Sequence, residues 1–88
     1  MKLMRKVRVK NALGLHARPA TAIVKLLQGT RSAVLFTYRK ETVNARSIMS
    51  ILMLAATKNS FITVVVDGED AQDTMEKIVH AFENEFGE

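Results

Sequence analysis

The spacing of apolar residues in the first half of the chain changes from a period of two to a helical period and back. Val7 and Val9 alternate with basic residues, which predicts a strand with one buried face. From Ala17 onward, apolar residues recur every three or four positions, which predicts an amphipathic helix that ends near Gly29. Residues 33–38 are rich in β-branched and aromatic side chains, so we expect a second strand there.

The middle of the chain favours a short hairpin followed by a helix with an excess of apolar residues. The segment around Thr42 and Val43 is expected to return beside the second strand. The turn at Arg39 and Lys40 lacks the usual glycine, which leaves the turn type open. The segment Ser47–Ala56 contains more apolar residues than one helical face can bury, so some of its side chains are expected at the surface.

The last third of the chain predicts a central strand and a terminal helix. Residues 61–66 are apolar on both faces, which suits a strand in the middle of a sheet, and Asp67 and Gly68 close it with a turn. Acidic residues then stand near the start of a helical pattern, where they complement the positive end of the helix dipole. These acidic residues are Glu69, Asp70 and Asp73, and the apolar helix positions are Met75, Ile78, Val79, Phe82 and Phe86.

The predicted elements follow the order βαββαβα. Strands and helices mixed in this way, with short connections, indicate an α+β fold in which helices cover one face of an antiparallel sheet. The 88 residues, 48% of them hydrophobic, are expected to form one domain over residues 1–88 with a small core. Because a small core supports few buried polar groups, any chemistry is expected at the surface. The absence of cysteine excludes disulfides and thiolate chemistry, and we expect no metal site.

The charge of the chain is basic. Thirteen Lys and Arg residues stand against nine Asp and Glu, which gives a formal charge of +4 and favours acidic partners, either nucleic acid or protein. No apolar run is long enough to span a bilayer, and the basic start lacks the apolar core of a signal peptide. We therefore expect a soluble intracellular protein without membrane insertion. Five basic residues crowd the predicted first strand: Lys2, Arg5, Lys6, Arg8 and Lys10.

Residues 14–20, with the sequence GLHARPA, place a histidine where a glycine-containing loop meets the start of the first predicted helix. Pro19 suits the first helical turn, because it needs no N–H there, so His16 lies just before that turn. Free backbone N–H groups favour an anion at this place, and Arg18 offers paired donors to phosphate oxygens. Neutral imidazole, the attacking form, is abundant near pH 7. Position alone leaves open the alternative that His16 is a solvated or capping residue.

The motif GLHARPA, preceded by Asn11, resembles the active-site signature of HPr, the histidine phosphocarrier of the bacterial phosphoenolpyruvate-dependent sugar phosphotransferase system. The resemblance extends over nearly the whole chain, through the element order, the sequence ARSIM at 45–49 and the sequence DGED at 67–70. It implies an open-faced β-sandwich, in which a four-stranded antiparallel sheet carries three helices on one face. It also implies a phosphoryl carrier that is not an enzyme and needs no cofactor.

The resemblance implies roles for the residues of this motif. A ring nitrogen of His16 is the expected phosphoryl acceptor, with Arg18 stabilising the phosphate. The implied donor is phosphorylated enzyme I, charged from phosphoenolpyruvate, and the implied acceptors are enzyme II A components. Two docked proteins can assemble the transition state between them, so the carrier needs no enclosed pocket. We expect a cytoplasmic monomer that shuttles between these partners.

The resemblance implies a function for the excess apolar residues of the second predicted helix. HPr-like proteins dock their partners through exposed hydrophobic residues there, and methionine side chains adapt to several surfaces. Basic residues at the rim attract acidic partner surfaces and speed encounter. The expected docking residues are Ala17, Ala20, Lys25, Ile48, Met49 and Leu52, with Arg18 in the basic rim.

Ser47 stands at the start of the second predicted helix, and its simplest role is an N-cap. The resemblance implies a second role, because a serine at this point is the target of a regulatory ATP-dependent kinase, HPr kinase/phosphorylase, in many bacteria. The two roles can coexist. A phosphate on Ser47 brings close to two negative charges into the docking patch and opposes enzyme I.

Several positions depart from the family pattern. Ala55 and Ala56 stand where a glycine commonly ends the second helix, and Asn59 is expected to supply the left-handed turn instead. His80 falls outside the apolar positions of the last helix and is expected to face solvent without a role.

Three alternative functions differ in the residues they require. A small basic nucleic-acid-binding domain could stack bases on Phe36 and Tyr38, but neither a GXXG clamp nor an RNP-type motif is present. A regulatory HPr paralogue that carries no phosphate generally lacks the histidine, whereas His16 is present. The nitrogen-related branch of the phosphotransferase system is the third, and the segment around Ser47 favours the sugar branch.

Overall fold

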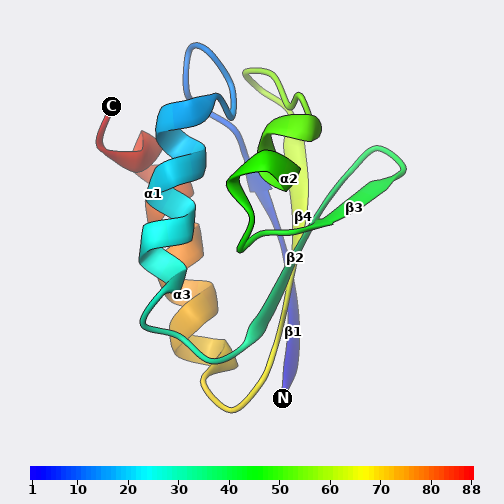
Figure 1. Cartoon of the computed structure of the whole chain (residues 1–88), viewed down its shortest axis with the longest axis vertical. Helices are drawn as coiled ribbons and strands as arrows, with labels where there is room; N and C mark the ends of the chain where they lie inside the picture. The colour runs from blue at the N-terminus through cyan, green and yellow to red at the C-terminus, as the bar shows by residue number, and fades with distance from the viewer.

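The computed structural model describes all residues from 1 to 88 and confirms the predicted order βαββαβα (Figure 1). Every predicted strand and helix is present, and a short 3₁₀ helix follows the last α-helix. The elements are β1 (Lys2–Arg8), α1 (Ala17–Leu27), β2 (Ala33–Tyr38), β3 (Glu41–Asn44), α2 (Ile48–Met53), β4 (Phe61–Asp67), α3 (Ala71–Glu83) and the 3₁₀ helix η1 (Glu85–Gly87).

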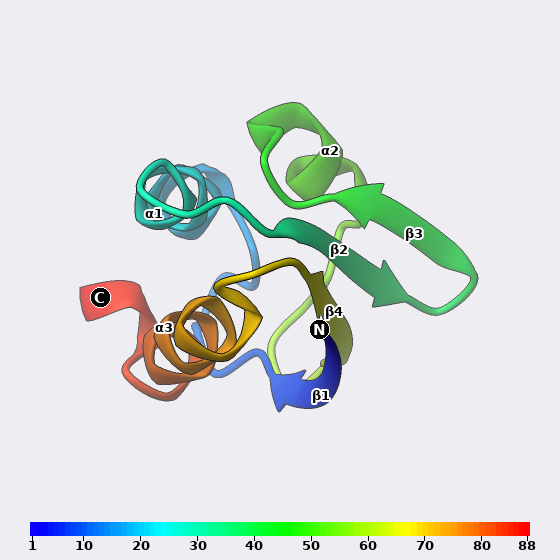
Figure 2. The same cartoon turned by 90° about the horizontal axis from the view of Figure 1, so that it is seen from below.

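The four strands form one antiparallel sheet in the order β1-β4-β2-β3. The strand predicted to be central, β4, pairs with β1 on one side and β2 on the other, and Val64 lies opposite both Arg5 and Phe36. Figure 2 shows that α1, α2 and α3 lie on one side of this sheet. The open-faced β-sandwich is therefore confirmed.

The core lies between the sheet and the helices. Along β4, Ile62, Val64 and Val66 are buried under the helices, whereas alternate residues face the uncovered side. Phe36 of β2 meets Phe82 of α3 edge to face, with their ring centroids 5.8 Å apart. This aromatic pair joins the sheet to the last helix.

Gly14 fixes the loop that leads into α1. Its φ angle is +69°, and a Cβ atom placed there would lie 2.3 Å from the carbonyl oxygen of Ala56. The same oxygen accepts a hydrogen bond from the N–H of Leu15 at 3.0 Å. The loop before α1 is thereby held against the segment that follows α2.

Three local expectations need correction. The second helix is shorter than Ser47–Ala56, and Ala55 itself takes the left-handed conformation after it, with φ 53°, because no glycine is available there. Asn59 is also left-handed, with φ 73°, but it serves the later turn into β4. Phe86 lies outside α3 and still packs on Phe82, with the ring centroids 4.9 Å apart. The hairpin turn contains no glycine, and Arg39 takes the left-handed conformation there, with φ 56°.

None of the helices combines the length and the apolar character that a membrane crossing requires.

Candidate functional site

His16 lies at the N-terminal end of α1, as the position of Pro19 predicted. It is the N-cap residue, with extended backbone angles, and its carbonyl oxygen accepts the first helical hydrogen bond from Ala20 at 3.1 Å. The N–H groups of the first turn have no acceptor within the helix, and this turn contains no acidic residue. The end of α1 beside His16 therefore offers an anion unpaired donors and a favourable dipole.

The imidazole of His16 is held through one nitrogen. Its Nε2 atom lies 3.1 Å from Oε2 and 3.2 Å from Oε1 of Glu88, whereas Nδ1 has no hydrogen-bonding partner in the chain. The side chain is 31% exposed, so a partner protein can reach the ring. A carboxylate at Nε2 favours the tautomer that carries its proton there and leaves the lone pair on Nδ1.

Glu88 is positioned by Asn11. The side-chain amide of Asn11 donates to Oε1 of Glu88 at 2.5 Å and to the carbonyl oxygen of Glu85 at 2.8 Å. Partial burial raises the pKa of Glu88, but hydrogen bonds from Asn11 and His16 outweigh this effect and leave the pKa lowered. An ionised carboxylate therefore stands beside the histidine ring at neutral pH.

Arg18 lies in the first turn of α1, two residues after the histidine, with its side chain exposed and outside any hydrogen bond or ion pair. Its charge contributes to the lowered pKa of Glu88. Arg18 and Lys25 line the same shallow depression along α1, together with Ala17. Arg18 and Lys25, the residues expected to form a basic rim, thus lie on one continuous surface of α1.

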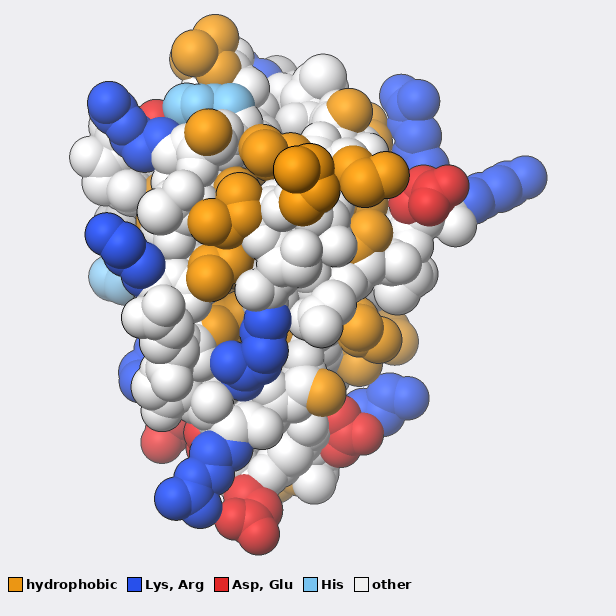
Figure 3. All heavy atoms as spheres, in the orientation of Figure 1, with side chains coloured by type: hydrophobic (Ala, Val, Ile, Leu, Met, Phe, Trp, Pro, Cys, Tyr) orange, Lys and Arg blue, Asp and Glu red, His pale blue; other side chains and the backbone are white.

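The apolar residues of α2 lie exposed beside this end of α1. Ile48 is 37% exposed and Met49 is 67% exposed, and Leu52 is partly exposed. Figure 3 shows hydrophobic side chains gathered over α2 and the adjoining part of α1. Sequence reasoning did not single out Leu13 and Met53, which are also strongly exposed.

The expectation that Ala20 contacts a partner is wrong. Ala20 is fully buried, on the same face of α1 as Ile23 and Leu27, and belongs to the core. Ala17 and Lys25 are exposed and accessible.

Ser47 caps α2 as predicted. Its hydroxyl oxygen accepts a hydrogen bond from the N–H of Ser50 at 3.2 Å, and the residue is partly exposed. The neighbouring Arg46 points the other way and donates to the carbonyl oxygens of Leu27, Thr30 and Ser32. Arg46 thereby ties the start of α2 to the end of α1, because it satisfies carbonyls that the helix end leaves free.

The arrangement of side chains supports neither a metal site nor a second site at His80. No group of three His, Asp or Glu residues is close enough to hold a metal ion. The side chain of His80 is exposed, and its ring forms hydrogen bonds only with Asn84.

Comparisons with known proteins agree with this geometry. A family model described as "PTS HPr component phosphorylation site" matches residues 3–84. The phosphocarrier protein HPr of Chlamydia muridarum is 49% identical over 80 residues, which cover 91% of this chain and 77% of that protein. The corresponding protein of Cupriavidus necator is 37% identical over 86 residues, covering 98% and 97%. A crystal structure of HPr from Thermoanaerobacter tengcongensis superposes with a TM-score of 0.93 at 30% identity, covering 98% of this chain and 97% of the other.

A surface histidine at a helix start, on an open-faced sandwich, needs no enclosed catalytic pocket if the protein carries a phosphoryl group instead of catalysing a reaction by itself. The family match over residues 3–84 and the similar curated proteins, which are phosphocarrier proteins, agree with this interpretation. The chain belongs to the HPr family of phosphocarrier proteins of the phosphotransferase system.

Proposed function

We propose that Nδ1 of His16 accepts a phosphoryl group from phosphorylated enzyme I and passes it to enzyme II A components. The observation that carries this assignment is the contact between Nε2 and Glu88, at 3.1 Å, which leaves Nδ1 as the free nucleophile. In the forward step the lone pair of Nδ1 attacks phosphorus, the N–P bond forms, and the bond from phosphorus to the donor breaks with its electron pair. The reverse sequence delivers the group to the acceptor.

The surroundings of His16 support both steps. The unpaired N–H groups at the start of α1 and the guanidinium of Arg18 stabilise the charge on the phosphoryl oxygens. Glu88 holds the ring in one tautomer and shares the positive charge that the ring acquires when its second nitrogen is phosphorylated. Its negative charge also repels phosphoryl oxygens, which keeps the phosphohistidine easy to discharge.

The docking surface consists of Ile48, Met49 and Leu52 with Ala17 beside the histidine. These side chains provide an apolar centre for partners of different shape, since methionine adapts readily. Lys25 and Arg18 form the basic rim that attracts an acidic partner. The chain acts as a single-domain monomer in the cytoplasm, because a carrier must leave one partner to reach the next.

Phosphorylation of Ser47 by an HPr kinase/phosphorylase regulates this carrier. The Ser47 hydroxyl lies one residue before Ile48, at the edge of the docking surface. A phosphate there places close to two negative charges against enzyme I and must be desolvated on docking. Phosphorylated Ser47 thereby slows the charging of His16.

The position of the phosphate on the ring tests the proposal most sharply. The chain is charged with enzyme I and phosphoenolpyruvate and then studied by ³¹P and ¹⁵N NMR at alkaline pH. Phosphate bonded to Nδ1 of His16 is the expected result. Phosphate on Nε2, or on His80, would contradict the assignment.

A further inference from the structure

The outer edge of β1 presents unpaired backbone groups. β1 is a terminal strand of the sheet, with only β4 beside it. Val9 donates to the carbonyl oxygen of Ser60 at 2.8 Å and accepts from the N–H of Asn59 at 2.7 Å. Because neighbouring residues of an antiparallel strand direct their N–H and C=O groups to opposite sides, those of Met4, Lys6 and Arg8 face away from the sheet. Here the fold leaves room for one more strand.

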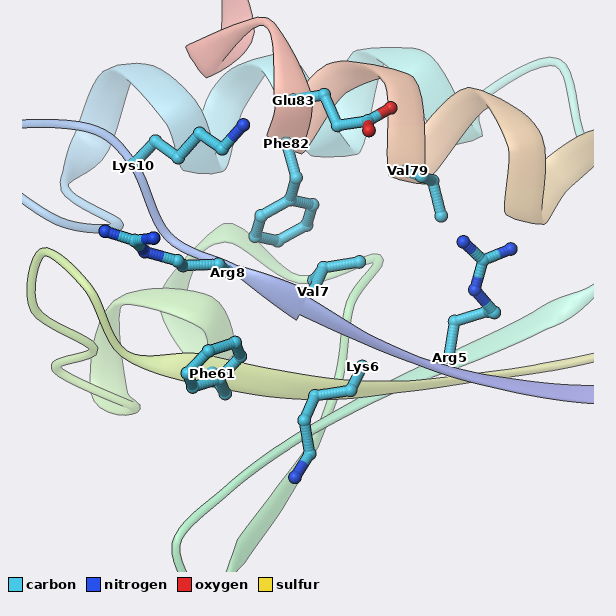
Figure 4. Close-up of a pocket in the computed structure, with 9 residues that line it drawn as sticks. All are labelled: Arg5, Lys6, Val7, Arg8, Lys10, Phe61, Val79, Phe82 and Glu83. Atoms are coloured by element: carbon cyan, nitrogen blue, oxygen red, sulfur yellow. The ribbon is translucent and has the colours of Figure 1, made fainter.

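A groove follows this edge. Figure 4 shows Lys6 and Phe61 on the uncovered side of β1, and Val79 and Phe82 of α3 on the other side. Phe61 is 56% exposed, and the ammonium of Lys6 lies 5.9 Å from the centre of its ring. The groove thus has a basic and aromatic wall on the open face, whereas its helix side combines the apolar Val79 and Phe82 with the cation Arg5.

The charge of the groove is strongly positive. The first 40 residues of the chain contain ten Lys and Arg residues and no Asp or Glu. No Lys or Arg side chain of the structure forms an ion pair with an Asp or Glu, so the cations of β1 have no acidic partner. Glu83, on the helix wall, is the single acidic residue in the groove lining, against the four cations Arg5, Lys6, Arg8 and Lys10.

We infer that the β1 edge binds an extended acidic segment of a partner protein by antiparallel strand addition. Its acidic side chains lie on the open face beside Lys6 and Arg8, and the intervening apolar side chains lie against Val79. The helix side carries the acidic Glu83 and the apolar Val79 as well as Arg5, whereas the open face carries only cations beside Phe61. The groove therefore favours acidic residues on the open face that alternate with apolar residues on the helix side. The inference does not depend on phosphoryl transfer, because the groove shares no residue with His16 or the docking surface.

Neither protection against aggregation nor binding of nucleic acid accounts for every feature of the basic edge. Charges on an edge strand prevent aggregation, and two copies of β1 would repel each other through four cations each, which disfavours a second copy as the occupant. That protective role does not require an exposed phenylalanine beside the cations. Nucleic acid would satisfy the charges but cannot match the alternating backbone donors and acceptors of Met4, Lys6 and Arg8.

The experiment measures binding of a fluorescent octapeptide of alternating Glu and Val by fluorescence anisotropy at low salt. Lys6→Glu is expected to weaken binding about five- to tenfold, because one attraction becomes a repulsion. Lys40→Glu makes the same charge change at the hairpin turn and is expected to alter binding less than about twofold. Equal losses in both variants would show attraction to net charge alone and overturn the inference.

Modified peptides test the backbone pairing without altering the protein. Side chains of directly opposed residues share one face, so the Glu residues beside Lys6 are those whose N–H groups pair with β1. Methylation of the Glu amide nitrogens should abolish binding, and methylation of the Val amide nitrogens should preserve it. Equal binding of the two methylated peptides, or tighter binding of a single-stranded oligonucleotide of the same charge, would contradict strand addition.

Discussion

Glu88 places its carboxylate 3.1 Å from Nε2 of His16, although 72 residues separate the two in sequence. The carboxylate is itself held by Asn11, in the loop that leads to the histidine. Asn11 and Glu88 therefore connect the loop before α1 to the end of the chain. The histidine ring directs Nε2 toward the protein and leaves Nδ1 accessible to a partner.

Replacing Glu88 by Ala is expected to release the ring of His16. Without the carboxylate, the proton of the neutral ring distributes over both nitrogens. The ring also loses its fixed orientation and the negative charge that stabilises the phosphorylated imidazolium, so phosphoryl transfer from enzyme I becomes roughly tenfold slower. Long-range ¹H–¹⁵N NMR at alkaline pH reads the tautomer, and a single-turnover assay reads the rate.

The Glu88→Gln variant serves as the matched control for this test. Its amide oxygen still accepts a hydrogen bond from Nε2, so the tautomer should stay as in the wild type. A mixture of tautomers already present in the wild type would contradict the positioning role of Glu88.

The apolar docking surface predicts that Met49→Glu weakens the interaction with enzyme I. A charge at this exposed position must be desolvated on docking, and we expect KM for the carrier to rise at least about tenfold with little change in kcat. Leu35→Glu is the control, because Leu35 is also exposed but lies on the uncovered face of the sheet. Similar KM values for the two variants would exclude the proposed surface.

Substitutions of Ser47 separate its two roles. Ser47→Ala removes the hydrogen bond to Ser50 and should lower the free energy of unfolding by about 1 kcal/mol while charging of His16 continues. Ser47→Asp keeps a capping oxygen but adds a negative charge, so it should retain stability and slow charging by enzyme I. Urea unfolding and the transfer assay give the two readouts. Unimpaired charging of Ser47→Asp would count against regulation through repulsion.

Asp70 predicts a specific loss of stability in acid. Hydrogen bonds from the Ser32 hydroxyl and from the backbone of Arg31 lower the pKa of Asp70 from 3.8 to about 2. Because the folded-state pKa lies below the unfolded one, this contribution is complete above about pH 4 and disappears as the pH falls from 3.8 toward 2. Urea unfolding at pH 7 and pH 2.5 should therefore show a destabilising effect of Asp70→Asn that shrinks in acid. An effect of equal size at both pH values would contradict the role of the Asp70 carboxylate.

Local signals were sufficient for the elements and for the centre of the site. Period-two spacing located β1, apolar character on both faces placed β4 in the middle of the sheet, and Pro19 placed His16 at the start of α1. Ser47 was recognised as a cap from its position alone. Each of these features depends on residues close together in sequence.

Contacts between residues far apart in the sequence could not be predicted. The contact of Glu88 with His16 requires the turn at Glu85 and Phe86, where both residues take positive φ angles although neither is a glycine. Ala20 shows a different error. Its helical spacing with Ile23 and Leu27 indicates the buried face of α1, and the structure places all three residues in the core.

The most direct test of the phosphocarrier mechanism is transfer of radiolabelled phosphate from phosphoenolpyruvate through enzyme I to wild type, His16→Ala and His80→Ala. His80 is the matched control, since it is the other histidine of the chain and is exposed. We expect acid-labile label on the wild type and on His80→Ala, and none on His16→Ala. Label that persists on His16→Ala, or an unlabelled wild type beside an active control carrier, would contradict His16 as the phosphoryl acceptor.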